Sequence, residues 1–309
     1  TQVDAINCVV LTPNWIIKIS SRLDIGKRRD NNEDALAYCA DLSQPDWQDN
    51  DMTNYLHLGE NGALAVVADG MGGANAGEVA SSISIQTIKD VFTTARVSAA
   101  VKGGEDTIKS LLLEAIKQAD SSILKRIATD DGTQGMGTTI VVCWVLSGKA
   151  YIVWCGDSRC YSYNPARGLK PLTHDHSLVQ ELVDQGEITQ EEAFTHPDGN
   201  IITRGLGDFG SEVNPDFIAH PVKENEILML CSDGLCGYCI DKAMETCMDQ
   251  NHTDTSKCCQ SLLEQALDAG GYDNIAIVAI SLLGDEQEKP APISFFQSLR
   301  RRVRRFTVT

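Results

Sequence analysis

Five aspartates stand at the ends of short apolar runs, and their carboxylates are the groups in this sequence best suited to chemistry. They are Asp34, Asp69, Asp157, Asp233 and Asp273. Aspartate is common where a strand gives way to a turn, which explains one or two of them. Five carboxylates converging from neighbouring strands repel one another unless a positive charge lies between them. Mg²⁺ or Mn²⁺ supplies that charge and prefers oxygen ligands. Two such ions roughly 3.5–4 Å apart can turn a shared water into a nucleophile.

Glycines and an arginine accompany these aspartates. Gly70 follows Asp69 and Gly234 follows Asp233, so backbone carbonyls can approach a ligand closely, although a plain tight turn also explains them. A dinucleotide-binding loop is excluded because the sixth position of its glycine pattern is Asn75. Arg29 precedes Asp34 by five residues and is suited to clamping a phosphate, unless it is only a solvated basic turn.

Cysteine and histidine chemistry is less well supported. Cys236 and Cys239 have the spacing of a redox dithiol, but no matching second pair completes a zinc site, and we interpret them as buried free thiols. The eleven scattered cysteines favour reduced thiols over a disulfide framework. We interpret His174 and His176 as turn residues before a helix. Arg159 is equally compatible with a structural ion pair and a ligand contact.

The elements that must position these residues alternate between strands and helices. Apolar runs of strand length lie at 35–38, 63–69, 152–157, 227–233 and 275–283. Helical apolar spacing lies at 77–97, 110–128, 177–186 and 258–269. Runs at 138–146 and 150–163 have hairpin spacing, which predicts an at least partly antiparallel sheet. The fold class is therefore α+β rather than a doubly wound parallel sheet.

The charge is strongly acidic and unevenly placed. The chain of 309 residues carries 26 basic and 43 acidic side chains, a net charge of −17. Residues 285–309 hold six basic and three acidic side chains, so the remainder carries about −20. Such a body disfavours nucleic acid as a partner. The basic tail is either a solvated segment or a segment that binds a membrane or an acidic partner weakly. Deletion of the tail would distinguish the two. No bilayer-spanning run or signal peptide is visible, which predicts a cytoplasmic protein.

The order of nine short motifs resembles the metal-dependent Ser/Thr protein phosphatases of type 2C, in their bacterial form. The resemblance runs from about Ile19 to Leu283. The motifs are Gly26-x-x-Arg29-x-Asn-Asn-Glu-Asp34, the run 66–73, the run 77–80, the run 135–139, Gly156-Asp157-Ser158-Arg159, the run 172–177, His196-Pro197 with the run 200–204, Ser232-Asp233-Gly234-Leu235, and Gly271-x-Asp273-Asn274.

This resemblance implies a four-layer α/β/β/α sandwich, two antiparallel sheets flanked by helices, in one domain over residues 1–284 with a flexible tail at 285–309. It implies a pair of Mn²⁺ or Mg²⁺ ions, with a third and weaker site. Metal ligands are expected at Asp34, Asp69, Gly70, Asp157, Asp233 and Asp273, with Glu33 and Asn274 supporting them. Arg29 would bind the substrate phosphate, so the expected catalytic residues are Arg29, Asp69 and Asp233.

The resemblance also implies the reaction. A hydroxide bridging the two ions would attack the phosphorus of phospho-Ser or phospho-Thr directly, in a monomer that opposes a Ser/Thr kinase. Met71 stands where some relatives carry a histidine, so the proton donor is unassigned and a metal-bound water is our candidate. The stretch 35–68 is predicted to be an inserted surface loop, and residues 175–204 resemble the family's mobile flap.

Two other functions compete with this one. A non-catalytic binding module of the same fold would be expected to lack one of Asp69, Asp233 or Asp273, and all three are present. A different two-metal hydrolase, such as a nuclease, is disfavoured by the acidic body and by the lack of a groove combining basic and aromatic residues.

Overall fold

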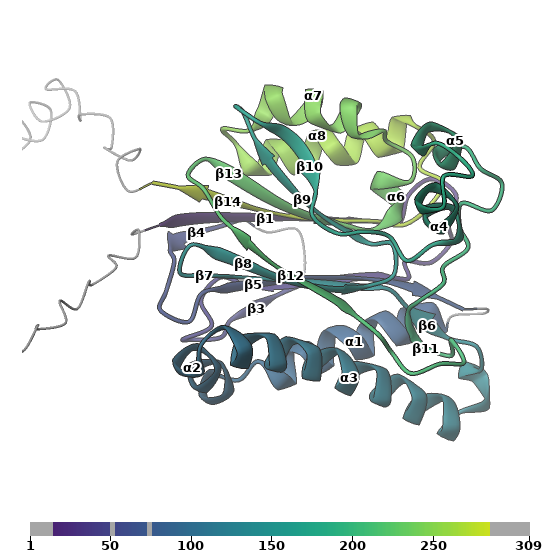
Figure 1. Cartoon of the computed structure of the whole chain (residues 1–309), viewed down its shortest axis with the longest axis horizontal. Coiled ribbons are helices and arrows are strands. Elements are labelled where there is room, and N and C mark those ends of the chain that lie inside the picture. The colour runs from purple at the N-terminus through teal and green to yellow at the C-terminus, as the bar shows by residue number, and fades with distance from the viewer. Residues whose placement is uncertain (1–14, 50–52, 73–75, 285–309) are drawn as a thin grey trace, which may run out of the picture.

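The computed structural model describes residues 15–49, 53–72 and 76–284, and Figure 1 shows their arrangement as two stacked β-sheets between two layers of helices. Every strand pairing in these ranges is antiparallel. The predicted α+β fold, with four layers in the order α/β/β/α, is confirmed. None of the helices in these ranges is both long and apolar enough to cross a bilayer. The predicted basic tail, residues 285–309, lies outside the described ranges.

The first sheet has six strands in the order β10-β9-β13-β14-β1-β4. Their bounds are β10 (Gly168–Pro171), β9 (Arg159–Asn164), β13 (Glu226–Cys231), β14 (Ile275–Leu283), β1 (Ile16–Asp24) and β4 (Thr53–His57). The central strand β14 is almost wholly buried, as expected for a continuous apolar run covered on both faces.

The second sheet has eight strands. Its main path is β11-β6-β5-β7-β8-β12, and β2 pairs with β5 and β3 off that path. The bounds are β11 (Leu206–Gly207), β6 (Gly137–Thr138), β5 (Ala63–Met71), β7 (Ile140–Leu146), β8 (Lys149–Cys155), β12 (Asp216–Pro221), β2 (Asp34–Cys39) and β3 (Trp47–Gln48). Ser147 and Gly148 both have positive φ in the predicted hairpin between β7 and β8, as a two-residue turn with matching twist requires.

The helices form the outer layers and one end of the sandwich (Figure 1). α1 (Gly77–Val91), α2 (Thr94–Gly103) and α3 (Glu105–Thr129) lie over the second sheet, whereas α7 (Asp241–Asn251) and α8 (Thr255–Asp268) cover the first. α4 (Leu178–Asp184), α5 (Gln190–Phe194) and α6 (Asp233–Cys236) gather at one end. A 3₁₀ turn, Asp131–Thr133, follows α3.

Three hydrophobic clusters correspond to the three interfaces between the layers. One joins α1–α3 to the second sheet around Trp144 and Phe92, whose rings meet edge to face at 5.4 Å. Another fills the space between the sheets, and the last joins the first sheet to α6–α8. Because core apolar residues make both sheets rigid, the loops at their ends can present polar groups in fixed positions.

Several boundaries differ from the predictions, three of them with consequences for the fold. The helix predicted at 77–97 ends at Val91, and α2 begins at Thr94 after a break at Phe92. The run predicted at 150–163 contains two strands, because β8 ends at Cys155 and β9 crosses into the other sheet. The run predicted at 227–233 ends at Cys231, and Asp233 is the first residue of α6.

The prediction of an inserted surface loop over residues 35–68 is wrong. Asp34–Cys39 and Ala63–Met71 belong to β2 and β5, and between them β3 pairs with β2 while β4 forms the edge of the first sheet. β3 and β4 are short and polar, so their sequence lacks the apolar pattern of a strand. Pairing with a neighbouring strand, together with the packing of one side chain from each strand, Trp47 and Leu56, against the core, accounts for them.

Candidate active site

The aspartates come from both sheets. Asp34 opens β2 and lies directly opposite Asp69 of β5 in the antiparallel register. Asp157 lies in the connection from β8 to β9, Asp233 begins α6 directly after β13, and Asp273 lies two residues before β14. The five carboxylates lie near enough to act on one another, because charges within this set raise the pKa values of Asp34, Asp69, Asp157 and Asp233.

Asp34 is anchored between the two sheets. Its side chain is buried, and the hydroxyl of Ser232 donates a 2.6 Å hydrogen bond to its Oδ2. The backbone N–H of Ala276 donates to the same hydroxyl oxygen at 2.9 Å. Burial, with the charges of Asp233 and Asp273, raises the pKa of Asp34 to about 8 although the bond from Ser232 opposes the shift. A buried carboxylate so held favours a neighbouring cation.

Asp69 is fixed through its backbone. Its N–H donates to the hydroxyl of Thr139 at 3.2 Å, and its carbonyl accepts from the Thr139 N–H at 2.9 Å and the Thr138 hydroxyl at 2.8 Å. Burial is the main cause that raises the pKa of Asp69 well above its usual value, followed by the charge of Asp34. Thr138 of β6 and Thr139, which precedes β7, thus hold the backbone of Asp69, while neighbouring carboxylates repel its side chain.

Two carboxylate oxygens in this cluster have no hydrogen-bond partner. They are Oδ1 of Asp157 and Oδ1 of Asp233, and both are buried. Burial first, and then nearby carboxylates, raise the pKa of Asp157 well above its usual value and that of Asp233 to about 6. A buried carboxylate oxygen without a hydrogen-bond partner destabilises the folded state unless a cation pairs with it. The side chains therefore fit a divalent metal ion chemically.

The described side chains do not form a complete metal cage by themselves. No group of three or more His, Cys, Asp or Glu side chains in the described ranges is arranged to hold an ion. Hard divalent ions accept backbone carbonyls and water as ligands, and Mg²⁺ in particular retains several waters. The carboxylates would accordingly supply only part of a coordination sphere, and the ligand roles of individual residues remain a prediction.

Arg29 and Asp273 form an ion pair at the same site. Nη2 of Arg29 lies 2.7 Å from Oδ2 of Asp273, and about half of the arginine side chain is exposed. The hydrogen bond to Asp273 is the main cause that raises the pKa of Arg29. An exposed guanidinium held beside a carboxylate cluster is placed to meet an anionic substrate.

Asn274 and Glu33 tie the loops around this pair together. The Asn274 side chain accepts from the Glu33 N–H at 2.8 Å and donates to the carbonyls of Ile25 and Asn31, both at 2.9 Å. The Glu33 carbonyl accepts from the Gly70 N–H at 3.1 Å. Burial is the main cause that raises the pKa of Glu33. The predicted supporting residues thus connect the loop before β2 with β5 and β14.

Gly70 is required by a close approach of backbone. A Cβ at this position would lie 2.1 Å from the carbonyl oxygen of Gly77 and 2.7 Å from that of Glu33. A side chain here would therefore push α1 away from β5. Packing alone therefore explains why residue 70 is glycine, and the predicted role of the Gly70 carbonyl as a metal ligand stays a prediction.

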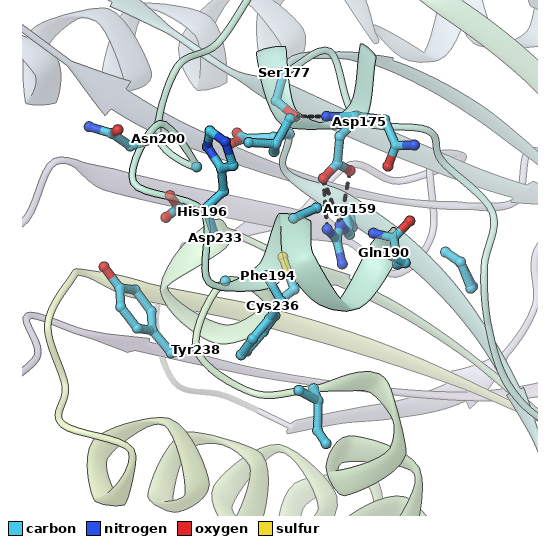
Figure 2. A pocket seen from close by; sticks show the side chains of 18 of the residues that line it. Arg159, Asp175, Ser177, Gln190, Phe194, His196, Asn200, Asp233, Cys236 and Tyr238 are labelled. Atoms are coloured by element: carbon cyan, nitrogen blue, oxygen red, sulfur yellow. Dashed lines mark hydrogen bonds and ion pairs between the residues drawn. The ribbon is translucent and has the colours of Figure 1, made fainter. Parts of the chain in front are cut away.

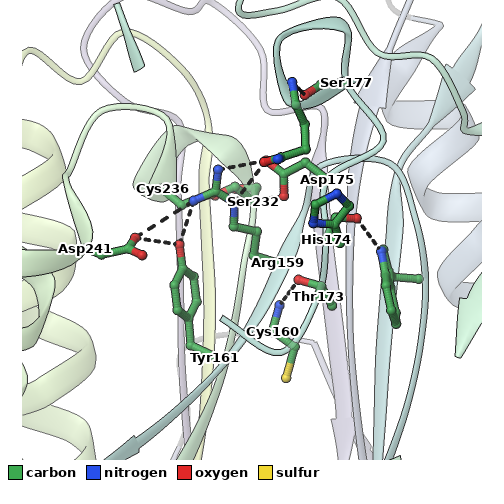
Figure 3. Close-up of polar contacts among 12 residues, drawn as sticks. Arg159, Cys160, Tyr161, Thr173, His174, Asp175, Ser177, Ser232, Cys236 and Asp241 are labelled. Carbon is green, nitrogen blue, oxygen red and sulfur yellow. Dashed lines mark hydrogen bonds and ion pairs between the residues drawn. The ribbon is translucent and has the colours of Figure 1, made fainter. Parts of the chain in front are cut away.

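Arg159 has a structural role. Its guanidinium makes hydrogen bonds of 2.7–3.1 Å to both oxygens of Asp175 and one of 2.8 Å to the Tyr161 hydroxyl, with Asp241 at 3.9 Å (Figure 3). Tyr161 in turn donates to Asp241 at 3.0 Å. This network joins β9 to α7 and to the segment before α4, so it positions the wall of the site.

A pocket of about 960 Å³ is lined by three of the five aspartates, Asp157, Asp233 and Asp273. Arg29 and residues of the predicted flap line it as well. The flap residues that Figure 2 labels are Asp175, Ser177, Gln190, Phe194, His196 and Asn200. The region predicted as a flap therefore forms a wall of the candidate active site.

The cysteines and histidines hold structural positions. Cys236 and Cys239 are buried free thiols, as predicted, and burial raises the pKa of Cys239 to about 11. His176 is buried and accepts from the Gly156 N–H at 3.1 Å, and burial lowers its pKa. His174 lies 2.7 Å from Asp184 of α4, which agrees with a turn role before that helix.

Several contributing residues were not assigned from the sequence. Ser232 lay inside a quoted motif, directly before Asp233, but its bond to Asp34 depends on contact between the two sheets. Asp175 likewise lay in a motif, and only the fold shows that it pairs with Arg159. Tyr238 and Phe194 line the pocket without any motif, and no signal in the sequence marks them.

Comparisons with known proteins agree with this site. The family model described as protein phosphatase 2C matches residues 47–268. The serine/threonine phosphatase stp of Listeria monocytogenes is 34% identical over 223 residues, which cover 72% of this chain and 85% of that protein. The serine/threonine protein phosphatase PstP of Mycobacterium tuberculosis is 30% identical over 278 residues, covering 90% of this chain but 47% of that longer protein.

Solved structures show the same fold. The crystal structure of the M. tuberculosis phosphatase PstP/Ppp superposes with a TM-score of 0.71 at 29% identity and covers 87% of this chain and 99% of that one. The PstP catalytic domain in complex with two manganese ions gives a TM-score of 0.69 at 28% identity, with the same coverage. The match over most of the sequence, the shared fold and the carboxylate cluster together lead to one assignment: this chain belongs to the protein phosphatase 2C family.

Proposed function

We propose that this chain is a protein phosphatase that hydrolyses phospho-Ser and phospho-Thr in proteins. The observation that carries the proposal is one pocket that contains Arg29 together with buried carboxylates, two of whose oxygens lack a partner. The similarity to serine/threonine phosphatases of L. monocytogenes and M. tuberculosis supports the same substrate class.

We assign metal-holding roles to Asp69, the Gly70 carbonyl, Asp233 and Asp273, with Asp34 and Glu33 acting through water. Asp157, whose Oδ1 has no partner, is the proposed additional ligand of a third and weaker site. Two Mn²⁺ or Mg²⁺ ions, when bound, supply positive charge and activate a shared water for direct attack on phosphorus. The PstP structure that contains two manganese ions supports this number.

The protein's own residues hold the substrate and the cluster. Arg29 would exchange its contact with Asp273 for a phosphate oxygen and so stabilise the charge that develops there. Ser232 fixes the orientation of Asp34, and Thr138 and Thr139 fix the backbone of Asp69.

The biological setting follows from the same proposal. We propose that the chain acts in the cytoplasm as a monomer, against a Ser/Thr kinase, with residues 1–284 as the catalytic domain. The basic tail, residues 285–309, is proposed to contact an acidic partner or membrane weakly. Tail deletion followed by vesicle-binding and activity measurements tests the last point, and an unchanged result removes it.

Hydrolysis of a phosphoserine peptide tests the function directly. With Mn²⁺ the full chain should release phosphate, and chelation should stop the release. Asp233→Asn should lower kcat/KM by at least 100-fold while the protein stays folded. A chain that binds the peptide without cleaving it would identify the alternative, a non-catalytic binding module, and phosphate release that resists chelation would reject the metal-dependent mechanism.

A further inference from the structure

Large hydrophobic side chains are exposed around the mouth of the pocket. Phe194, Tyr238 and Ile240 all line it, and they are 40%, 38% and 53% exposed. They come from two segments of the chain, because Phe194 belongs to α5 whereas Tyr238 and Ile240 lie between α6 and α7. Exposed apolar groups gathered at a site commonly mark a surface that binds a partner.

Tyr238 belongs to an aromatic pair. Its ring stacks on that of Tyr272 with centroids 5.5 Å apart, and Tyr272 is half exposed. The guanidinium of Arg28 lies 5.6 Å from the centroid of the Tyr272 ring. Contacts of this kind hold aromatic rings in fixed orientations and so prepare a flat apolar surface.

This surface adjoins the carboxylate cluster. Tyr272 directly precedes Asp273, and Tyr238 lies one turn beyond α6, which begins at Asp233. Burial, with the charges of Asp233 and Asp273, raises the pKa of Tyr238, so its hydroxyl stays neutral near pH 7. A side chain resting on the two rings would therefore lie close to a phosphate bound at Arg29.

The pocket is also too large for a phosphorylated side chain alone. Its volume of about 960 Å³ is in the upper part of the range of sites that enclose drug-sized ligands. A peptide substrate brings neighbouring residues with it, and these must lie against the pocket walls. The side chains of Tyr238 and Ile240 offer apolar surface beside the acidic Asp233 and Asp241, so a neutral apolar neighbour can gain burial there while an acidic one is repelled.

We propose that Tyr238, Tyr272 and Ile240 form a specificity subsite for a bulky apolar side chain next to the phosphorylated residue of the substrate. The proposal rests on the proposed protein phosphatase function and deepens it. Because the subsite binds the residue next to the phosphorylated one rather than the phosphate, it determines which phosphoproteins are hydrolysed faster. Hydrophobic pockets typically discriminate by about tenfold or more.

The test uses phosphoserine peptides that differ only in the residues on either side of the phosphoserine, Leu in one peptide and Ser in the other. With Mn²⁺, the full chain should show a kcat/KM about tenfold higher for the Leu peptide. Tyr238→Ala should bring the ratio of the two kcat/KM values to about one, whereas Tyr238→Phe, which keeps the ring, should retain it. Leu124→Ala is a matched control, because Leu124 is similarly exposed but lies on α3, away from the pocket.

The possible failures are distinguishable. Equal kcat/KM values for the two peptides in the unaltered chain, or a preference that survives Tyr238→Ala, overturn the subsite and leave the phosphatase function intact. Tyr272→Ala provides a second variant, and it should lower the ratio even if Tyr238→Ala fails to fold. Absence of hydrolysis of both peptides overturns the proposed function and the subsite with it.

Discussion

Nη2 of Arg29 lies 2.7 Å from Oδ2 of Asp273, so the residue predicted to bind phosphate is paired with a residue predicted to bind metal. The pair is partly exposed, which makes its contribution to stability small. Its position is more informative than its energy. A divalent ion that takes Asp273 as a ligand would release the guanidinium toward the substrate, so metal binding and phosphate binding are expected to be coupled.

Arg29→Ala tests the role of this guanidinium. Loss of one charged donor to a developing oxyanion typically lowers the rate by about 10²–10³-fold. We expect a decrease of that size in kcat/KM for a phosphoserine peptide, and a smaller one for Arg29→Lys, which keeps the charge but not the forked geometry. Arg167→Ala, an exposed arginine in the turn between β9 and β10, is the control. Near-normal kcat/KM for Arg29→Ala would remove Arg29 from the mechanism.

Ser232→Ala tests the connection between the sheets. It removes the hydrogen bond to Asp34 and the acceptor of the Ala276 N–H. Residues that orient metal ligands typically change metal affinity by about 10–100-fold when they are removed. We expect a weakening of that size for Mn²⁺ in isothermal titration calorimetry. Ser84→Ala, a buried serine that bonds within α1, should leave the affinity unchanged. Equal affinities in both variants would assign Ser232 a purely structural role.

Arg159→Met tests the buried ion pair with Asp175. The two side chains are only 20% and 11% exposed, and removal of the arginine leaves a carboxylate without its partner. We expect the free energy of unfolding to fall by about 3 kcal/mol, measured with urea. Arg126→Met breaks an exposed pair with Asp130 and should cost about 0.5 kcal/mol or less. If the free energy of unfolding falls by the same amount in Arg159→Met and Arg126→Met, the Arg159 network does not stabilise the pocket wall.

The stability of the metal-free protein should fall as pH rises above 6.5. Burial raises the pKa of Asp34 to about 8, so the folded state keeps a proton that the unfolded state, with a pKa near 4, has already released. Stability from a raised carboxyl pKa is present at low pH and is lost as pH rises through the folded-state pKa. His176, whose pKa is lowered by burial, opposes this slope only below about 6.5.

Urea unfolding with a chelator should therefore show a lower free energy of unfolding at pH 8.5 than at pH 6.5, by about 2 kcal/mol from Asp34 alone. Asp69 and Asp157, whose pKa values burial also raises, act in the same direction. Mn²⁺ replaces the proton as the compensating charge, so the loss should shrink when the ion is present. Asp34→Asn in the metal-free state should shrink it as well. A metal-free protein that is equally stable at both pH values would contradict the electrostatic account of the cluster.

Much of the fold could be predicted because its main strands are continuous apolar runs. Burial on both faces accounts for runs such as Ile275–Leu283 and Ile140–Leu146, and the turn residues between β7 and β8 identify their hairpin. The five aspartates could be identified for the same reason, since each lies at the start or the end of an apolar run. Their chemistry then followed from repulsion among carboxylates.

The remaining features depend on tertiary pairing that no local pattern encodes. The register that places Asp34 opposite Asp69 is set when β2 and β5 pair, and the Ser232 bond forms only where the sheets meet. β4 has no apolar run and exists because β1 offers an unpaired edge. The break at Phe92 lacks a glycine or proline, so the sequence could not mark it.

A crystal structure of the full chain with Mn²⁺, with the metal located by anomalous scattering, tests the central claim most directly. We predict two manganese ions near Asp69, with Asp233 and Asp273 as further ligands and Arg29 released from Asp273. Manganese absent from this pocket at saturating concentration, or bound elsewhere while Arg29 stays paired with Asp273, would contradict the account.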